Sequence, residues 1–252
     1  MSDMAPMPNP GPAPDPPVEP TVSGATSGEP RAPSGFVTQP GPADLHAWHV
    51  LRPLLDGRPY LPFSPGAMRA GGLVYVCNLI VHRAPRQVVE CGAGVSTVVL
   101  ARLLAERGTG RLTALEHDPG WAERVEELIA REELAHVARV VLAPLDPSGW
   151  YDASGVARLP EAVDLLVVDG PPADRAEIAL ARHPALATLE PRLAADALVI
   201  LDDVGRAGEQ EVLARWEREH LWDFERLEDE AIAVGTRRPG RLRTASRSSQ
   251  VP

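Results

Sequence analysis

Five acidic residues stand where predicted β-strands end: Glu90, Glu116, Asp169, Asp202 and Asp203. Each follows a short run of apolar residues that is typical of a buried strand. In a parallel sheet covered by helices, the ligand lies beyond the carboxyl ends of the strands, where the direction of the chain switches. We therefore expect these carboxylates to surround a single binding site.

A glycine-containing turn follows the first of these acids, in the segment Glu90-Cys91-Gly92-Ala93-Gly94-Val95-Ser96-Thr97. Its two glycines permit a tight turn and let a ligand approach the bare backbone. A dinucleotide fingerprint requires a third small residue where Thr97 stands, and a carboxylate at Glu90 would repel a pyrophosphate. Glu90 could instead pair with an ammonium group. The alternative is an ordinary strand-to-helix turn with a solvated Glu90.

Glu116 ends the second predicted strand, 26 positions after Glu90. A carboxylate there can accept hydrogen bonds from both hydroxyls of an unphosphorylated ribose. His117 follows it and could touch the base, whereas the alternative is that Glu116 is a plain cap beside Asp118. A ribose without phosphate, together with an ammonium group, describes S-adenosylmethionine better than a nicotinamide or flavin cofactor.

The elements that must position these residues alternate along the chain. Two amphipathic helices are predicted first, over 43–57 and 66–82. Strands and helices then follow in turn: a strand around 88–89, a helix over 96–107, a strand over 112–116, a helix over 119–133, strands over 137–143 and 163–169, a helix over 174–182, a strand over 197–201, a helix over 205–220, and strands over 222–227 and 231–236. This order predicts an α/β fold, a doubly wound Rossmann-like sheet of seven strands that is mostly parallel, with an antiparallel edge hairpin and an N-terminal helical cover.

Composition sets the limits of this domain. With 252 residues and 44% hydrophobic content, the chain can bury one large core. Residues 1–42 hold twelve of the 27 prolines and few large apolar groups, so we expect a disordered leader. The arginine-rich segment 237–252 is expected to be a disordered tail. The domain between them, 43–236, would consist of a helical cover over 43–84 and a Rossmann-like core over 85–236.

Charge and residue usage exclude several classes of protein. The net charge of −10 argues against a nucleic-acid partner. No signal segment or long apolar run is present, so we expect a cytoplasmic protein without a membrane partner. Cys77 and Cys91 lack the spacing of a metal site or disulfide framework. All 25 basic residues are arginine, which excludes any mechanism that needs a lysine.

Four motifs in sequence resemble those of class I S-adenosylmethionine-dependent methyltransferases, most closely the small O-methyltransferase-like branch with an Asp-Gly-Pro-Pro motif after the fourth strand. They are Val88 to Thr97, Leu115 to Pro119, Asp164 to Pro172 and Val199 to Asp203. The resemblance implies that Gly92, Ala93, Gly94 and Ser96 cradle the methionine part of the cofactor. It also implies that Glu116 binds the ribose and that Ala143-Pro144-Leu145 forms a wall beside the adenine.

The resemblance extends to catechol-type enzymes, in which an acid after the fourth strand and an acidic pair after the fifth bind Mg²⁺. Asp169, Asp202 and Asp203 match that pattern, and oxygen ligands suit a hard divalent ion. The sequence departs from it at Pro172, where those enzymes carry a basic lysine. In the alternative, Asp169 orients the ammonium group or the substrate, and the other two acids cap the strand and the next helix.

Methyl transfer to oxygen also needs a group that accepts a proton, for which Asp169 and His183 are candidates. Trp150, Tyr151, Tyr60 and Phe63 could line a pocket for a small-molecule acceptor or could be packing anchors. We expect O-methylation of a small molecule, and a homodimer is compatible with the sequence. The alternatives are an NAD-dependent oxidoreductase on a degenerate Rossmann turn, a non-catalytic nucleoside-binding module and an aminopropyltransferase.

Overall fold

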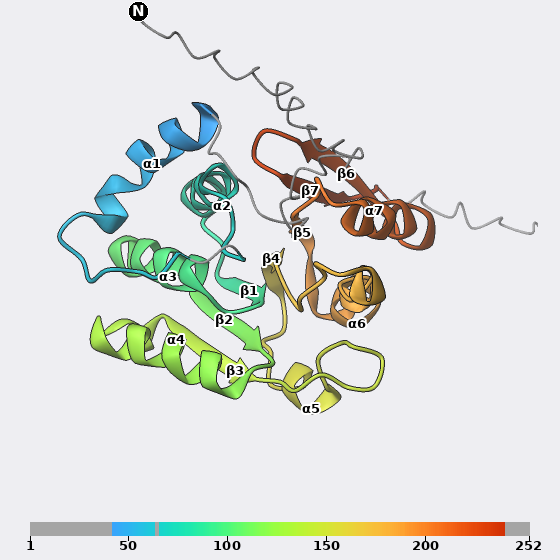
Figure 1. Ribbon diagram of the computed structural model, residues 1–252, viewed down its shortest axis with the longest axis horizontal. Coiled ribbons are helices and arrows are strands. Elements are labelled where there is room, and N and C mark those ends of the chain that lie inside the picture. The colour runs from blue at the N-terminus through green and yellow to red at the C-terminus, as the bar shows by residue number, and fades with distance from the viewer. Residues whose placement is uncertain (1–41, 64–65, 240–252) are drawn as a thin grey trace, which may run out of the picture. The chain divides into compact units, whose positions relative to one another are not determined.

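A computed structural model of the chain describes residues 42–63 and 66–239. Its centre is a seven-stranded sheet in the order β3-β2-β1-β4-β5-β7-β6, in which only β7 runs antiparallel to its neighbours (Figure 1). The strands are β1 (Gln87–Cys91), β2 (Arg111–Glu116), β3 (Ala138–Leu142), β4 (Val163–Val168), β5 (Leu193–Asp202), β6 (Trp222–Leu227) and β7 (Ile232–Arg237). The predicted fold class, including the antiparallel pair at one edge, is confirmed.

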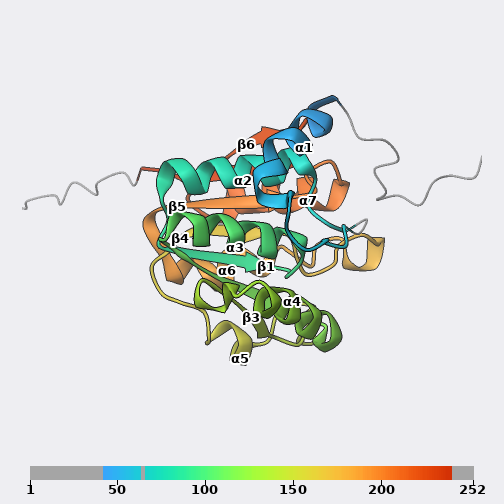
Figure 2. The same ribbon diagram turned by 90° about the vertical axis from the view of Figure 1, so that its left-hand side faces the viewer.

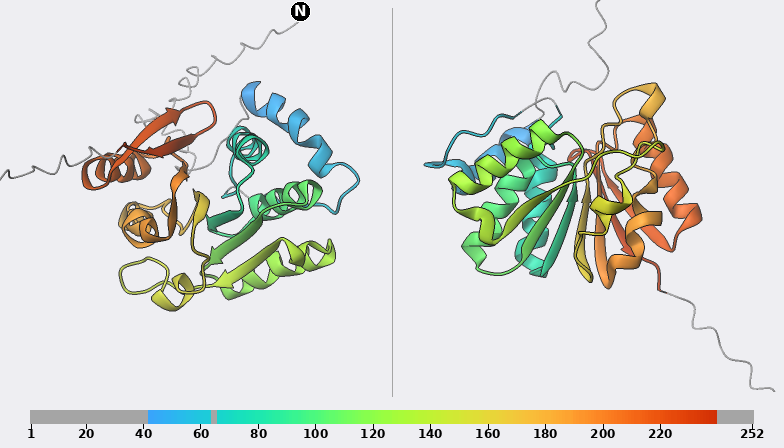
Figure 3. Two further views of the ribbon diagram at one scale, coloured as in Figure 1. Left: turned by 180° about the vertical axis from the view of Figure 1, so that it is seen from behind. Right: turned by 90° about the horizontal axis from the view of Figure 1, so that it is seen from below.

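Helices cover both faces of the sheet (Figures 2 and 3). One face carries α1 (Pro42–Leu55), α2 (Ala70–Arg83), α3 (Val95–Arg107) and α4 (Pro119–Arg131); the other carries α5 (Ala153–Val156), α6 (Pro184–Leu189) and α7 (Ala207–Glu219). Successive strand residues point to opposite faces, so Val88 packs into the first core and Val89 into the second. The side chains on both faces of the central strands are buried, which explains why these strands are apolar throughout.

The register of the sheet brings the ends of its central strands level with one another. Cys91, at the end of β1, pairs with Leu115 of β2 on one side and with Val168 of β4 on the other. The residues that follow each strand therefore meet at one edge. This arrangement places Gly92, Glu116 and Asp169 around a common space.

The prediction of a helix over 174–182 is wrong. That segment holds only a 3-10 turn at Ala176–Ile178, and the α-helix begins at Pro184. Proline suits the first position of a helix because it lacks the N–H that would find no partner there. The pair Asp174 and Glu177 resembles a capping box in the sequence, but no side chain caps the 3-10 turn.

The ends of the domain differ from the prediction by one residue each. Helix α1 begins at Pro42 and β7 ends at Arg237. The rest of the predicted leader, residues 1–41, and residues 240–252 of the predicted tail lie outside the described residues. Among the described residues, no helix combines the length and apolar character needed to cross a membrane.

Two adjacent glycines let α2 pack closely against the turn between β6 and β7. A Cβ atom on Gly72 would lie 2.9 Å from Cγ2 of Ile232 and 3.1 Å from the carbonyl oxygen of Glu230. A Cβ atom on Gly71 would lie 3.4 Å from Cα of Glu230. The second helix of the domain and its last hairpin are thus in direct backbone contact.

Candidate active site

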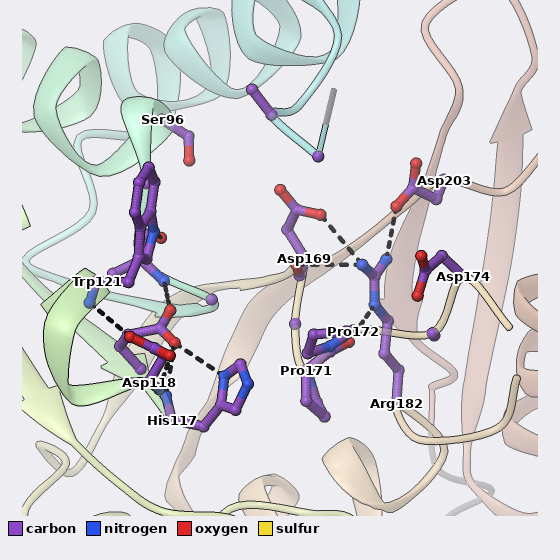
Figure 4. A pocket seen from close by; sticks show the side chains of 18 of the residues that line it. Ser96, His117, Asp118, Trp121, Asp169, Pro171, Pro172, Asp174, Arg182 and Asp203 are labelled. Carbon is purple, nitrogen blue, oxygen red and sulfur yellow. Dashed lines mark hydrogen bonds and ion pairs between the residues drawn. The ribbon is translucent and has the colours of Figure 1, made fainter. Parts of the chain in front are cut away.

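A cavity of about 780 Å³ opens beyond the carboxyl ends of β1, β2, β4 and β5 (Figure 4). It receives residues from the glycine turn after β1, the start of α4, and the segments that follow β4 and β5. Its lining comprises Gly66, Ala67, Gly92 to Ser96, Glu116 to Asp118, Gly120, Trp121, Arg124, Tyr151, Asp169 to Asp174, Arg182, Asp203 and Arg206. Of the five strand-end acids, Glu116, Asp169 and Asp203 line this cavity, whereas Glu90 and Asp202 do not.

The glycine turn brings bare backbone to the cavity. Gly92 has a φ of +90°, and a Cβ atom there would lie 2.8 Å from the carbonyl oxygen of Asp169, so only glycine fits. Gly94 differs, because the nearest atom to a Cβ there would be Oγ of Ser96 at 4.0 Å. The space beside Gly94 at the start of α3 is open to a ligand.

Glu90 lies beneath the turn and does not line the cavity. Its side chain is fully buried, and its Oε2 accepts a hydrogen bond of 2.6 Å from the hydroxyl of Thr97. Burial raises the pKa of Glu90 to about 7, although hydrogen bonds from Ser96 and Thr97 oppose that rise. The Oε1 atom of Glu90 has no hydrogen-bond partner among the described residues, and the contact between Glu90 and an ammonium group stays a prediction.

Glu116 lies in the cavity wall as predicted, and its carboxylate is held by backbone. Oε2 accepts from the N–H of Ala93 at 3.1 Å, and Oε1 accepts from those of His117 and Asp118 at 2.7 and 2.8 Å. The Nδ1 of His117 lies 2.8 Å from Oε1, and this hydrogen bond raises the pKa of His117. Glu116 is thus fixed in orientation and links the glycine turn to the start of α4.

The first turn of α4 contributes a residue that the sequence analysis did not single out. Asp118 caps the helix through a 2.7 Å hydrogen bond from the N–H of Trp121. The indole Nε1 of Trp121 in turn donates to the carbonyl oxygen of Ala93 at 2.7 Å. The ring therefore lies along the glycine turn at the cavity wall (Figure 4). The Asp118-Pro119 start of the helix is the signal that could have located it.

The segment Ala143-Pro144-Leu145, predicted to form a wall beside the adenine, lies outside the cavity lining. None of these three residues lines the cavity, and Ala143 is fully buried in the second core. Leu145 instead forms a β-bridge with Tyr151, which does line the cavity. The Tyr151 side chain is buried and its hydroxyl has no hydrogen-bond partner. A ligand in the cavity could supply that partner.

The other aromatic candidates lie elsewhere among the described residues. Trp150 is buried in the second core beside Tyr151, at a ring distance of 5.0 Å. Phe63 packs edge-on against Trp48 with ring centroids 4.7 Å apart. Tyr60 is 85% exposed and is not part of the cavity lining. Tyr151 alone of the four predicted aromatic residues lines the cavity.

The three predicted metal ligands do come together. Carboxylate oxygens of Asp169, Asp202 and Asp203 all lie within 4.8 Å of one another. Asp169 and Asp203 line the cavity, while Asp202 is buried behind them. Burial and the nearby acids raise the pKa of Asp169 well above its usual range and that of Asp202 to about 7.

A buried arginine occupies the middle of this cluster. Arg182 is 3% exposed, and its guanidinium bonds the side chains of Asp169 at 3.3 Å and Asp203 at 3.1 Å (Figure 4). Further hydrogen bonds reach the carbonyl oxygens of Asp169, Pro171 and Asp202 at 3.1, 3.2 and 3.2 Å. All five N–H groups of the guanidinium are used. Arg182 supplies the positive charge that the lysine-free sequence seemed to lack.

His183, predicted as a candidate base, is not brought to the cavity. Its Nε2 lies 3.0 Å from a carboxylate oxygen of Glu219 on α7, and it is absent from the cavity lining. The chain turns at this point so that Arg182 faces inward and His183 faces α7. Arg182, the immediate neighbour of the predicted candidate, lines the cavity instead.

Glu209 and Arg206 add two further charged groups around Arg182 and Asp203. Glu209 of α7 is fully buried, with Oε1 3.6 Å from a nitrogen of Arg182. Arg206 pairs with Asp203 at 2.7 Å. Burial raises the pKa of Glu209 to about 7, while Arg182 and Arg206 act in the opposite direction. Two guanidinium groups therefore pair with three carboxyl groups, those of Asp169, Asp203 and Glu209.

The residues present fit S-adenosylmethionine better than they fit a metal ion. The open space at Gly94, the fixed Glu116 carboxylate and the unpartnered Tyr151 hydroxyl all face one cavity large enough for a cofactor and an acceptor. Of the three aspartates, Asp169 and Asp203 already pair with the guanidinium of Arg182 through their side chains, whereas Asp202 meets it only through its backbone carbonyl oxygen. A divalent ion that used the same two carboxylate oxygens would compete with the guanidinium.

Comparisons with known proteins agree with this interpretation. Residues 89–204 match the family model of a methyltransferase domain. No curated protein matches the sequence. Solved structures share the fold: a methyltransferase, PaMTH1, from Podospora anserina with bound SAH has a TM-score of 0.56 at 13% identity, covering 79% of this chain and 89% of that one.

Two further structures give similar values. The cofactor-bound protein Rv0187 from MTB has a TM-score of 0.54 at 18% identity, with 82% of this chain and 94% of that one covered. An O-methyltransferase from Bacillus cereus in complex with SAH has a TM-score of 0.51 at 18% identity, with 81% and 94% covered. The solved structures show that the chain shares their fold, and the family match identifies a methyltransferase domain within residues 89–204.

Proposed function

We propose that this chain is an S-adenosylmethionine-dependent methyltransferase that transfers the methyl group of the cofactor to an oxygen atom of a small molecule. The observation that carries the proposal is the position of Asp169. Its carboxylate points into the cavity between the side of the glycine turn and Arg182 (Figure 4). A proton acceptor in that place faces both the cofactor side and the acceptor side of the cavity.

The cofactor side of the cavity is assigned to the residues after β1 and β2. Gly92, Ala93, Gly94 and Ser96 would surround the methionine part, because backbone there is accessible and Gly94 leaves open space. Glu116 would accept hydrogen bonds from the ribose hydroxyls. His117 and Trp121 line the wall next to it and would contact the base.

Bound S-adenosylmethionine supplies a methyl group activated by its sulfonium. The protein contributes orientation and a proton acceptor, because an in-line displacement requires the acceptor oxygen, the methyl carbon and the sulfur to be aligned. Asp169 would take the proton from the acceptor hydroxyl as the new carbon–oxygen bond forms. Arg182 holds the Asp169 carboxylate through a contact of 3.3 Å and prevents it from turning away.

A small acceptor fits the size of the site. The cavity of about 780 Å³ has to hold both the cofactor and the acceptor, which leaves space for a compact molecule such as a phenol or a sugar. The acceptor side is lined by Pro171, Pro172, Asp174 and Arg206. We place the acceptor hydroxyl between these residues and Asp169.

Calorimetric titration of the full chain with S-adenosylhomocysteine and with NAD tests the cofactor assignment. We expect binding of S-adenosylhomocysteine and none of NAD; the reverse result would favour an oxidoreductase. Incubation with methyl-labelled S-adenosylmethionine and a panel of phenols and sugar hydroxyls then tests the reaction. Binding without label transfer to any acceptor in the panel would favour a non-catalytic nucleoside-binding module.

A further inference from the structure

We propose that Arg182 takes the place of a divalent cation in the acid cluster, so that this site holds and orients its carboxylates without a metal ion. The inference rests on the proposed function, because it concerns how the acceptor side of the same cavity is built. It replaces the predicted magnesium site with a cation that belongs to the chain itself.

The first argument is the position of the guanidinium. Arg182 donates to the carboxylates of both Asp169 and Asp203, which are two of the three acids that would bind a metal. Its remaining N–H groups reach the carbonyl oxygens at the ends of β4 and β5. One side chain therefore bridges the same two strand ends that a bound ion would bridge.

The second argument concerns space. Divalent ions bind carboxylate oxygens at roughly 2.0–2.6 Å. The nitrogens of Arg182 already lie 3.1 Å from Oδ2 of Asp203 and 3.3 Å from Oδ1 of Asp169. An ion that used these two oxygens would need the position of the guanidinium and would be repelled by its charge. The ion and Arg182 are therefore alternatives.

The third argument is that the surroundings are built for this arginine. Arg182 is 3% exposed, and Glu209, which is fully buried on α7, lies 3.6 Å from the same guanidinium. Asp203 has a second arginine partner in Arg206 at 2.7 Å. A buried cation surrounded in this way is permanent, unlike an ion that exchanges with solvent.

The experiment measures Mn²⁺ binding to the full chain by electron paramagnetic resonance, in the absence of cofactor and acceptor. Wild type, Arg182→Met, Arg182→Lys and Asp203→Asn are compared. Arg102→Met is the matched control, because Arg102 is also buried and paired with an acid, Glu132 at 2.6 Å, but lies away from the cavity. Thermal melting of each variant is recorded with EDTA and with Mg²⁺.

We expect no Mn²⁺ binding by the wild type and no effect of Mg²⁺ on its melting temperature. Arg182→Met should melt lower than wild type in EDTA, bind Mn²⁺ at a concentration at which the wild type binds none, and regain melting temperature in Mg²⁺. Arg102→Met should also melt lower but show no response to either ion. Arg182→Lys keeps a positive charge and should bind less Mn²⁺ than Arg182→Met.

Stoichiometric Mn²⁺ binding by the wild type that Asp203→Asn abolishes would overturn the proposal. A folded Arg182→Met chain that gains no Mn²⁺ affinity would also overturn it. If Arg182→Met does not fold, the comparison of wild type with Asp203→Asn decides the matter. Failure of the wild type to bind S-adenosylhomocysteine would contradict the proposed function without affecting the metal result.

Discussion

The hydroxyl of Thr97 donates a hydrogen bond of 2.6 Å to the buried carboxyl of Glu90 and accepts one of 2.8 Å from the N–H of Gly94. A side chain on the first turn of α3 thus connects the end of β1 with the bend of the glycine turn. Thr97 counts against a dinucleotide site in the sequence, and here it fixes the loop that faces the cavity. Thr97 and Glu90 hold the turn on the side away from the cavity. The side of the turn that lines the cavity stays free for a ligand.

Glu90→Gln should become more stable relative to wild type as the pH rises. Burial raises the pKa of Glu90 to about 7, so between its unfolded pKa of 4.5 and about 7 the folded chain keeps a proton that the unfolded chain releases. The free energy of unfolding of the wild type therefore falls with rising pH in that window. Glutamine is neutral and does not contribute this fall. Urea denaturation of both proteins at about pH 5 and about pH 8 should show a relative gain of roughly 2 kcal/mol for the variant; an unchanged difference would refute the argument.

Gly94→Val should abolish cofactor binding without loss of stability. The backbone of Gly94 is extended, and an added Cβ meets no atom closer than 4.0 Å, so the new side chain occupies open space in the cavity. Gly92→Ala is the comparison, because it would place a methyl group 2.8 Å from the backbone of Asp169 at a φ of +90°. We expect the first variant to melt like wild type but bind no S-adenosylhomocysteine, and the second to melt several degrees lower. Full affinity in Gly94→Val would remove this turn from the cofactor site.

Glu116→Gln should weaken S-adenosylhomocysteine binding by about tenfold or more, since hydrogen bonds to a charged group contribute roughly 1.5–3 kcal/mol each. The amide keeps one acceptor oxygen for the N–H groups of His117 and Asp118, so the fold should survive. Glu123→Gln, an exposed acid on α4, serves as the control for charge alone. Calorimetry measures both, and equal affinities would show that Glu116 has only a structural role.

Tyr151→Phe should leave the stability unchanged or raise it by about 1 kcal/mol, because the buried hydroxyl has no partner to lose. Its removal should nevertheless reduce the affinity for S-adenosylhomocysteine if a ligand supplies the missing hydrogen bond. Chemical denaturation with and without ligand separates the two effects. A clear loss of stability in the ligand-free protein would indicate an interaction of the hydroxyl within the protein and would contradict this assignment.

Much of the fold could be predicted, because the spacing of apolar residues and the composition of each segment can be read locally along the chain. The apolar runs around Val88 and Leu165 identify strands buried on both faces, and alternation with helices then implies the parallel sheet. The prediction was wrong for the segment after β4. Asp174 and Glu177 have the spacing of a capping box, but the helix begins at Pro184. Local signals of comparable strength pointed to two different helix starts, and the packing of the chain decided between them.

The site was predictable where the backbone alone determines it. Glu116 and the glycine turn follow strand ends, and the register of the sheet brings them together. Arg182 could not be located in this way, because it comes from an irregular segment whose side-chain directions depend on tertiary contacts. Two adjacent side chains point in different directions here: Arg182 contacts the acids, and His183 contacts Glu219 of α7. Sequence spacing carries no information about that choice outside regular helices and strands.

The contact between the glycines of α2 and the hairpin of β6 and β7 has a consequence during synthesis. The ribosome releases α2 early, but Ile232 and Glu230, against which Gly72 packs, emerge near the end of the chain. Moreover, β7 inserts between β5 and β6, so the central sheet lacks a strand at that position until residue 237 has left the ribosome. The nascent chain therefore exposes the unpaired backbone N–H and C=O groups along one edge of β5, and one side of α2, until β7 pairs with them. The domain cannot complete its folding before translation of its final strand.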